Sequence, residues 1–492
     1  MSTILRLCKT SGANLKPHLS DMIIILLESL SISEPQFMSY LSFHTDRYKI
    51  NKDQLDQARS SATNASPILE AIHQIVYVID ATVLELLAPR LSVLIKKGIG
   101  LPTRAGCGSF VYMLTVTCSN DFRPFSDGIL LAFAATLTDR SGISRKSSST
   151  AIGHISKLAS ASVIESLIMK HRENYLAKTE TFDKGVSAVL FLEMYRSAPD
   201  SMREFRGLIL PLAFMGIRDV SDTATSKLWQ EIWDENVAGD TQAIRTLTLE
   251  IIELCAVVLQ NSSSWTLKKQ VGKSLSDVAN ANGSQIVNYS CKLIAILTES
   301  LTGRTWDGKE SLLLGLENVC VQGVAYFDTH PETKIDMENL FIRECRKTNN
   351  QAYQRHAITA MANVLEALKS ERFADICDFL EETAKEDSKN YIEENNHNMP
   401  LSILIRSSAF QAIGKVFPRT LENHHLFAEN VCSMLVLSLN GQVWNIRCAV
   451  LESLASIFNR LLGSEAVLLK NMGNIFEMLL PGLDDMKVIS FY

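Results

Sequence analysis

The sequence predicts an all-α protein built from stacked, antiparallel helix pairs, and three observations support this fold class. Hydrophobic residues make up 46% of the 492 residues, which is enough to bury an extended core, whereas aromatic residues make up only 7%. Apolar side chains recur at helical spacing throughout the chain. A helix–turn–helix pattern also repeats at intervals of about 40 residues, which indicates a repeat array rather than several separate globular domains.

One helix pair can be followed between residues 124 and 158. An apolar helix ends at Asp139, a short polar turn follows, and a second helix carries Ala151, Ile152 and Ile155 on one face. In this turn a residue able to end a helix stands six residues before a cation near the start of the next helix. Turns of the same kind occur at residues 91–104, 301–309 and 437–447.

The cations of these turns form a series whose spacing gives the length of the repeat. Successive members are 41, 39, 84, 41, 46, 51 and 41 residues apart, so most steps are one repeat and the longest is two. A period of about 40–47 residues in paired helices is typical of HEAT and armadillo solenoids, and we expect about 10 to 12 repeats. We expect each cation to bind an acidic or amide group of the next repeat, with partner binding as the alternative. The series is Arg104, Arg145, Lys184, Lys268, Lys309, Arg355, Arg406 and Arg447.

The whole chain, residues 1–492, is predicted to be a single continuous solenoid with three interruptions. A polar connection lies near residues 44–66, and an irregular repeat near residues 218–262 accounts for the doubled step. An acidic loop near residues 381–400 accounts for the step of 51 residues. We interpret this loop as a solvated insertion, with the binding of a basic partner as the alternative.

Both ends of the sequence are interpreted as cut. Residues 480–485 close an apolar helix, and too few residues follow for its partner helix. Residues 19–41 read as an apolar helix pair with no polar capping repeat before it, although solenoids need capped ends. We therefore expect the chain to be a piece, or a shortened isoform, of a longer array.

Charge and cysteine content disfavour several classes of function. The net charge of −6 gives no basic surplus for binding nucleic acid or an anionic membrane. The ten cysteines include no C-x-x-C pair, so neither a zinc site nor a redox motif is predicted, and we expect buried free thiols in a reducing compartment. The most apolar early run, residues 22–27, is far too short to span a membrane.

One stretch, residues 303–311, has the glycine and lysine positions of a phosphate-binding loop, which are occupied by Gly303, Gly308 and Lys309. However, Glu310 stands where such a loop needs a Ser or Thr hydroxyl for magnesium. The preceding residues are also spaced like a helix rather than a buried strand. We therefore interpret the stretch as a turn between two helices, with a nucleotide site as the alternative.

Within this turn, Asp307 and Glu310 have the spacing of a capping box. We expect Asp307 to cap a helix that begins at Gly308, so that replacing Asp307 by Ala would cost about 1 kcal/mol. We also expect Trp306 to pack between neighbouring helix pairs.

No catalytic constellation is found in the sequence. The segment Gly106–Ser109 resembles a nucleophile turn only superficially, because it lacks the strand that precedes such a turn. We therefore expect no enzymatic activity, no cofactor and no metal site.

Five stretches resemble the C-terminal part of a known family, the large HEAT-repeat proteins that act as proteasome adaptors and scaffolds. The two tryptophans around Glu231 and the segment that contains Trp306 are the most specific of them, and the resemblance runs from about Leu19 to near the end of the chain. Family members are several times longer than this sequence. The stretches are residues 100–108, 137–140, 210–216, 228–236 and 301–310.

The resemblance implies a non-enzymatic scaffold that binds the proteasome core particle and regulatory particle, tethers them to each other and supports quality control of their assembly. It further implies links to trafficking or motor proteins, a cytoplasmic and nuclear location, and a peripheral association with the endoplasmic reticulum or endosomes. It supplies no partner-contact residues. A nuclear-transport receptor that binds cargo and a small GTPase is the alternative, because such receptors share the architecture and the acidic charge balance.

Overall fold

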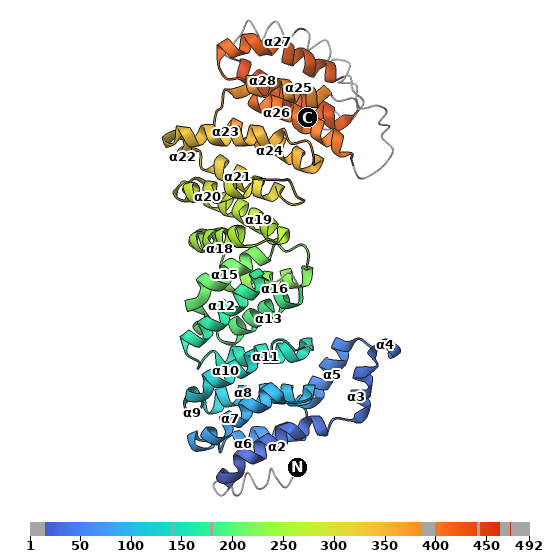
Figure 1. Ribbon diagram of the computed structural model, residues 1–492, viewed down its shortest axis with the longest axis vertical. Coiled ribbons are helices and arrows are strands. Elements are labelled where there is room, and N and C mark those ends of the chain that lie inside the picture. Colours follow the sequence, from blue (N-terminus) through green and yellow to red (C-terminus); the bar gives the residue numbers. More distant parts are fainter. Residues whose placement is uncertain are drawn as a thin grey trace. The chain divides into compact units, whose positions relative to one another are not determined.

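The computed structural model describes residues 15–139, 141–177, 181–385, 399–439, 443–462 and 473, and its regular structure is helical (Figure 1). No β-strand occurs within these ranges. The prediction of an all-α solenoid of helix pairs is therefore confirmed. No helix in the described ranges is long and apolar enough to cross a lipid bilayer.

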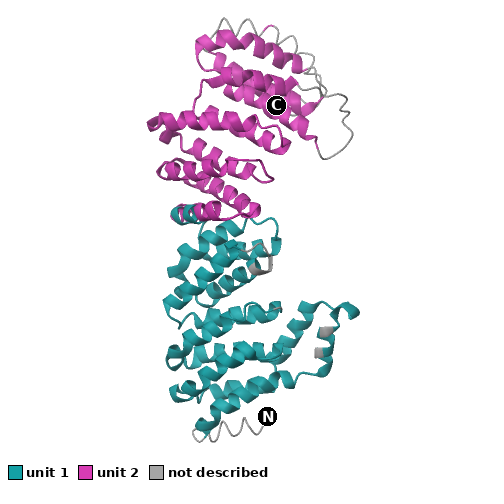
Figure 2. Cartoon of the chain, in the orientation of Figure 1, with its two compact units in different colours: residues 1–239, 249–254 teal, residues 240–248, 255–492 magenta. Residues whose placement is uncertain are grey.

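Contacts between Cα atoms divide the chain into two compact units (Figure 2). Unit 1 comprises Met1–Gly239 and Leu249–Leu254, and unit 2 comprises Asp240–Thr248 and Cys255–Tyr492. The single continuous array inferred from the sequence stays a prediction.

The helices of unit 1 alternate between longer helices and short one-turn segments that lead into them. They are η1 (Lys16–His18), α2 (Leu19–Ile32), α3 (Gln36–Phe43), α4 (Thr45–Tyr48), α5 (Lys52–Asn64), α6 (Pro67–Val76), α7 (Ala81–Lys97), α8 (Leu101–Thr117), α9 (Ser119–Phe122), η2 (Arg123–Phe125), α10 (Ser126–Ala134), α11 (Gly142–Ile155), α12 (Ala161–Ala177), α13 (Thr181–Ser197), α14 (Pro199–Met202), η3 (Arg203–Phe205), α15 (Arg206–Gly216) and α16 (Thr223–Asn236).

Unit 2 begins with α17, and the helix α18 contributes residues to both units. The remaining helices are α17 (Asp240–Thr246), α18 (Thr248–Asn261), α19 (Trp265–Asn282), η4 (Gly283–Ile286), α20 (Val287–Ser300), α21 (Glu310–Gln322), α22 (Val324–Thr329), α23 (Pro331–Cys345), α24 (Gln351–Ala367), η5 (Arg372–Asp375), α25 (Cys377–Lys385), α26 (Leu401–Val416), α27 (Leu421–Ser438) and α28 (Trp444–Leu461).

In both units the second helix of each pair packs against the second helix of the next pair. In unit 1, α8 contacts α11, α11 contacts α13, and α13 contacts α16; in unit 2, α19 contacts α21, α21 contacts α24, α24 contacts α26, and α26 contacts α28. Fully buried side chains such as Phe110, Ile152 and Leu316 lie on these helices. Burying a side chain of this size contributes about 1.5–3 kcal/mol, so each pair depends on its neighbours for its core.

Glycine and serine meet across four of these contacts between second helices. A Cβ atom added to the glycine would lie less than 3.0 Å from an atom of the serine, so the two helices approach more closely than a larger residue allows. The four pairs are Gly108 with Ser147, Gly153 with Ser197, Gly272 with Ser311, and Gly414 with Ser453.

The segment near residues 44–66, predicted from its polarity to be a connection, contains the helix α5. This helix begins after Asn51, whose side chain accepts hydrogen bonds from the N–H groups of Asp53 and Gln54, and it packs against α8 and α11. Arg59 on α5 binds Glu34 through Nε at 2.6 Å and Asp56 through Nη1 at 3.2 Å. An ion-paired polar helix therefore covers part of the layer of second helices.

The other two interruptions also contain helices. Residues 218–262 include α16, the short α17 and α18, so the first helix of that repeat is broken near Leu247. The beginning of the predicted acidic loop, residues 381–385, forms the last turns of α25. Residues 386–398 and the predicted helix end at 480–485 lie outside the described residues.

We predict that Gly272→Ala lowers the free energy of unfolding by about 1–3 kcal/mol, because the new methyl group would overlap backbone atoms of Ser311 and Leu312, which cannot rotate away. Gly128→Ala is the matched control, since a Cβ at Gly128 in α10 meets nothing within 4 Å. That control should raise stability by up to about 1 kcal/mol through helix propensity. Denaturant unfolding followed by circular dichroism measures both changes, and an unaffected Gly272→Ala protein would contradict the close approach.

Candidate functional site

Four members of the cation series bind backbone carbonyl groups at the end of the first helix in their own pair or in the turn that follows it. Arg145 Nη1 donates to the carbonyl oxygen of Asp139 at 2.7 Å, and Arg104 Nε donates to that of Gly98 at 3.2 Å. Lys309 and Arg406 make the same kind of contact, through Lys309 Nζ to Gly303 at 3.3 Å and Arg406 Nε to Ala384 at 3.0 Å. The last carbonyl groups of a helix have no hydrogen-bond donor within the helix and carry a partial negative charge. A nearby cation supplies both a donor and an opposite charge.

Two members also have the acidic partner in the next repeat that the sequence predicts. Arg104 forms an ion pair with Asp139, and Lys184 Nζ lies 3.4 Å from Asp219 Oδ2. Both side chains of the second pair are almost completely buried. Burial alone would raise the pKa of Asp219, but hydrogen bonds from Ser221 and the charge of Lys184 hold that pKa below its ordinary value.

The remaining members do not follow one pattern. The ammonium group of Lys268 lies 5.4 Å from the ring centre of Trp265, and the guanidinium group of Arg447 lies 5.6 Å from that of Trp444. Arg355 is half-buried on α24. The similar spacing of these cations in the sequence therefore does not give them the same contacts, and partner binding by any of them stays a prediction.

The stretch 303–311 is a turn between α20 and α21, and its lysine cannot reach a phosphate group. Lys309 is completely buried, and its ammonium group donates to the carbonyl oxygens of Gly303 and Arg304. Burial and the nearby charge of Lys347 lower the pKa of Lys309, while Glu344 partly opposes them. The helix α20 occupies the place where a phosphate-binding loop has a strand.

The predicted helix cap at Asp307 is wrong. The helix α21 begins at Glu310 rather than Gly308, the residue in the N-cap position is Lys309, and no side chain caps it. Asp307 is exposed in the preceding turn. The positive φ angle of 107° at Gly308 extends this turn and delays the helix. One half of the capping box does form, since the N–H of Gly308 donates to Glu310 Oε2 at 3.0 Å.

Replacing Asp307 by Ala should therefore change the free energy of unfolding by less than about 0.5 kcal/mol, as for an exposed side chain without contacts. Replacing Glu310 by Ala should cost about 1 kcal/mol, because the N–H of Gly308 loses its acceptor. Thermal unfolding of the two variants beside the unmodified chain decides between them. The opposite order of effects would restore Asp307 as the cap.

Lys309→Ala should lower the free energy of unfolding by about 1–3 kcal/mol, because the completely buried side chain is removed and the carbonyl groups of Gly303 and Arg304 lose their donor. Lys227→Ala, which removes an exposed lysine from α16, is the control and should have little effect. Equilibrium dialysis with labelled ATP should detect no binding to the unmodified chain or to either variant. Nucleotide binding by the unmodified chain that disappears in the Lys309→Ala variant would restore the nucleotide site.

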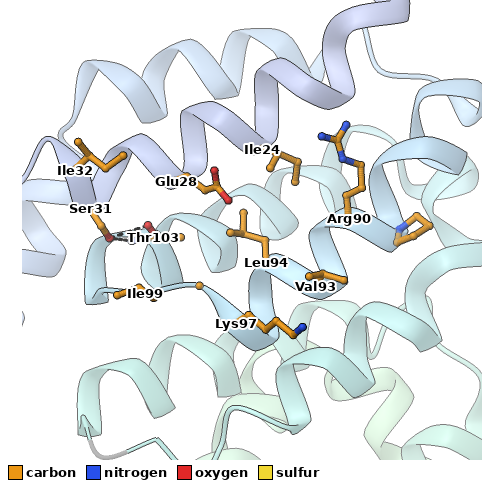
Figure 3. A pocket seen from close by; sticks show the side chains of 12 residues that line it. Ile24, Glu28, Ser31, Ile32, Arg90, Val93, Leu94, Lys97, Ile99 and Thr103 are labelled. Atoms are coloured by element: carbon orange, nitrogen blue, oxygen red, sulfur yellow. Dashed lines mark hydrogen bonds between the residues drawn. The ribbon is translucent and has the colours of Figure 1, made fainter.

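A groove of about 800 Å³ lies between α2 and α7 and is closed at one end by the turn that leads into α8 (Figure 3). Its apolar lining includes three strongly exposed side chains, which are Ile32 on α2 at 83%, Val93 on α7 at 54% and Ile99 in the turn at 87%. Glu28 and Lys97 come to the groove from opposite helices. Exposed apolar side chains bordered by charges are typical of a surface that binds another protein.

The groove is held in shape by hydrogen bonds between its walls. The hydroxyl groups of Ser31 and Thr103 lie 2.7 Å apart, and Thr103 Oγ1 also donates to the carbonyl oxygen of Leu27 at 3.1 Å. At the other end, Arg90 Nη1 donates to Asp21 Oδ1 at 2.5 Å. Sequence reasoning missed this groove because Ile32, Val93 and Ile99 belong to the same apolar pattern as the buried core.

The segment Gly106–Ser109 does not form a nucleophile turn, because it lies within the helix α8. Burial raises the pKa of the Cys107 thiol to about 12, so the thiol stays protonated at neutral pH. Ser109 Oγ lies 3.4 Å from His73 Nε2, too far for a strong hydrogen bond, and burial lowers the pKa of that histidine. Within the described residues, no group of three or more His, Cys, Asp or Glu side chains is arranged to hold a metal ion.

Two family models match the chain, one in each half. Residues 15–176 match the HEAT-repeat domain of the proteasome adapter and scaffold protein ECM29, and residues 320–484 match the C-terminal ARM-like repeats of ECM29. The chain is also 32% identical over 480 residues to the proteasome adapter and scaffold protein ECM29 of Homo sapiens. The chain belongs to the ECM29 family. That alignment covers 94% of this chain and 26% of the human protein.

A more distant member of the family aligns with a similar share of this chain and of its own length. The proteasome-associated protein ECM29 homolog of Drosophila melanogaster is 25% identical over 485 residues, which cover 94% of this chain and 25% of the fly protein. The chain thus spans about a quarter of the length of these two relatives. Among solved structures, importin β in an ammonium sulfate condition aligns with 98% of this chain and 64% of its own, at 12% identity and a TM-score of 0.45, which is too low to support an inference about function.

Proposed function

We propose that this chain is a non-enzymatic scaffold that binds the proteasome and tethers its core particle to its regulatory particle. Membership of the ECM29 family is the observation that carries this proposal, because the relatives are named as adapters, scaffolds or components of the proteasome. As further parts of the same proposal, the chain supports quality control of proteasome assembly and the placement of proteasomes within the cell.

The geometry of the two units is compatible with a binding role. Stacked helix pairs present extended surfaces to a partner, and the groove between α2 and α7 adds exposed apolar side chains of the kind found at interfaces.

The proposed partners are subunits of the core and regulatory particles, and, by family resemblance, trafficking or motor proteins. Nucleic acid is not among them, because the net charge of −6 gives no general attraction to phosphate backbones. The proposed location is cytoplasmic and nuclear, with a peripheral association with the endoplasmic reticulum or endosomes. A nuclear-transport receptor remains the alternative to be eliminated by experiment.

The proposal predicts that the tagged full chain, mixed with purified core and regulatory particles, increases the amount of the joined complex on a native gel. Affinity capture of the chain from lysate, followed by mass spectrometry, should enrich subunits of both particles. An unrelated α-solenoid of similar length is the control for non-specific retention by long helical surfaces.

Three other outcomes would contradict the proposal. If the chain retains one particle but does not join the core particle to the regulatory particle, the tethering role is refuted. If it retains neither particle, proteasome binding by this chain is refuted. Capture of a small GTPase in its GTP-bound form, with no proteasome subunits, would favour the transport receptor instead.

A further inference from the structure

Two tryptophans from neighbouring helix pairs stack on each other at the surface of unit 2. The ring centres of Trp265 and Trp306 lie 4.7 Å apart with an angle of 28° between the ring planes. Trp265 is the first residue of α19, and Trp306 lies in the turn before α21, which packs against α19. The expected packing of Trp306 between helix pairs is therefore seen, but the stacked pair is only partly covered, because Trp265 remains 54% exposed.

The turn that carries Trp306 is fixed by several contacts. Lys309 donates to the carbonyl oxygens of Gly303 and Arg304, and Thr305 Oγ1 lies 3.1 Å from Asn349 Oδ1 of the following repeat. The Trp306 ring lies so close to Gly308 that an added Cβ atom would be 3.1 Å from Cζ3 of the ring. A partner would therefore meet a preformed aromatic surface and would lose little free energy in ordering it.

A cavity of about 640 Å³ opens beside the tryptophan pair. Its floor includes the largely buried apolar side chains of Leu259 and Ile296. Its rim carries Lys268 and Arg304 together with Glu299. The cavity thus combines an apolar floor, an aromatic wall and charged groups at the opening, which is the composition of a site for a peptide side chain.

The charges around the cavity are mainly positive, although the chain as a whole has a net charge of −6. The charged residues that line the cavity are the cations Lys268 and Arg304 and the carboxylate Glu299. Neither Lys268 nor Arg304 forms an ion pair with another described residue, so both are available to a carboxylate.

We propose that this cavity is a docking site for an acidic peptide segment of a partner protein. An apolar side chain of the segment enters the cavity over Leu259 and Ile296 and packs against the Trp306 ring. A neighbouring carboxylate of the segment then lies at the opening and pairs with Lys268 and Arg304. Tryptophan and arginine are the residues most enriched among those that carry binding energy at interfaces.

The small size of the site sets the expected strength of binding. One cavity of this volume covers far less area than a standard protein interface, so a single segment should bind weakly and exchange rapidly. Because the cations lie at the surface, the affinity should fall as ionic strength rises. The inference does not require the partner to be a proteasome subunit, so its failure and the failure of the proposed function are distinguishable.

The test uses a phage-displayed library of random 12-residue peptides selected on the full chain and counter-selected on the Trp265→Ala variant. Enrichment of peptides that combine Asp or Glu with an apolar residue is expected. Enrichment of basic peptides, or of no peptide class over the counter-selected variant, would overturn the proposal.

A selected peptide is then synthesised with a fluorescein label, together with a twin in which Asp and Glu are replaced by Asn and Gln, and both are titrated by fluorescence anisotropy. Arg304→Glu and Trp265→Ala should each weaken binding of the acidic peptide at least about tenfold. Arg203→Glu and Tyr77→Ala change exposed residues in unit 1 and serve as matched controls that should leave binding unchanged. Equal binding of the two peptides, or equal binding to the Arg304→Glu variant, would refute the charge recognition.

Because Arg304 and Trp265 are exposed, their replacement should leave the circular dichroism spectrum unchanged, and each variant is checked in this way before titration. The alternative occupant of the cavity is a second copy of the chain, and sedimentation velocity detects such self-association. Dimers of the unmodified chain that dissociate in the Trp265→Ala variant would assign the cavity to a second copy and overturn the proposal.

Discussion

The close packing of successive second helices is the constraint on which the rest of each unit depends. Glycine faces serine at four of these contacts, and in the pair formed by Gly272 and Ser311 the glycine meets the backbone of the neighbouring helix itself. A helix held this closely by its neighbour can hardly slide or rotate. The turn that precedes it is therefore fixed as well, and so are the cation and any aromatic side chain on that turn.

This constraint explains why the sequence predicts the repeat better than it predicts the contacts of individual residues. The period of about 40 residues can be seen in the sequence because every pair needs an apolar face and a turn. Arg104, Arg145 and Lys309 lie near the start of the second helix of their pairs, and all three bind carbonyl groups at the end of the preceding helix or in the turn after it, whereas the sequence led us to expect acidic or amide groups of the next repeat. Which atom each cation would bind depends on how far the first helix extends, and local sequence leaves that open.

Three features were missed for physical reasons that can be named. Asp307 has the sequence position of a cap, but the positive φ angle of Gly308 moves the start of α21 to Glu310. The helix α5 is too polar to be recognised from hydrophobic periodicity, because Arg59 and its two carboxylate partners replace much of the usual apolar contact. The groove between α2 and α7 is lined by apolar residues that no sequence pattern separates from the core.

Closure of each turn by a cation only a few residues away also has a kinetic consequence. Lys309 reaches back six residues to Gly303, and Arg145 reaches back six residues to Asp139, so each of these turns can form as soon as its own helix pair is complete. Contacts that are close in sequence cost little chain entropy to form, and proteins rich in them fold quickly. A chain of this kind can fold one helix pair at a time as it leaves the ribosome. The apolar face of each pair is then buried by the next pair, and its burial does not require segments far along the chain.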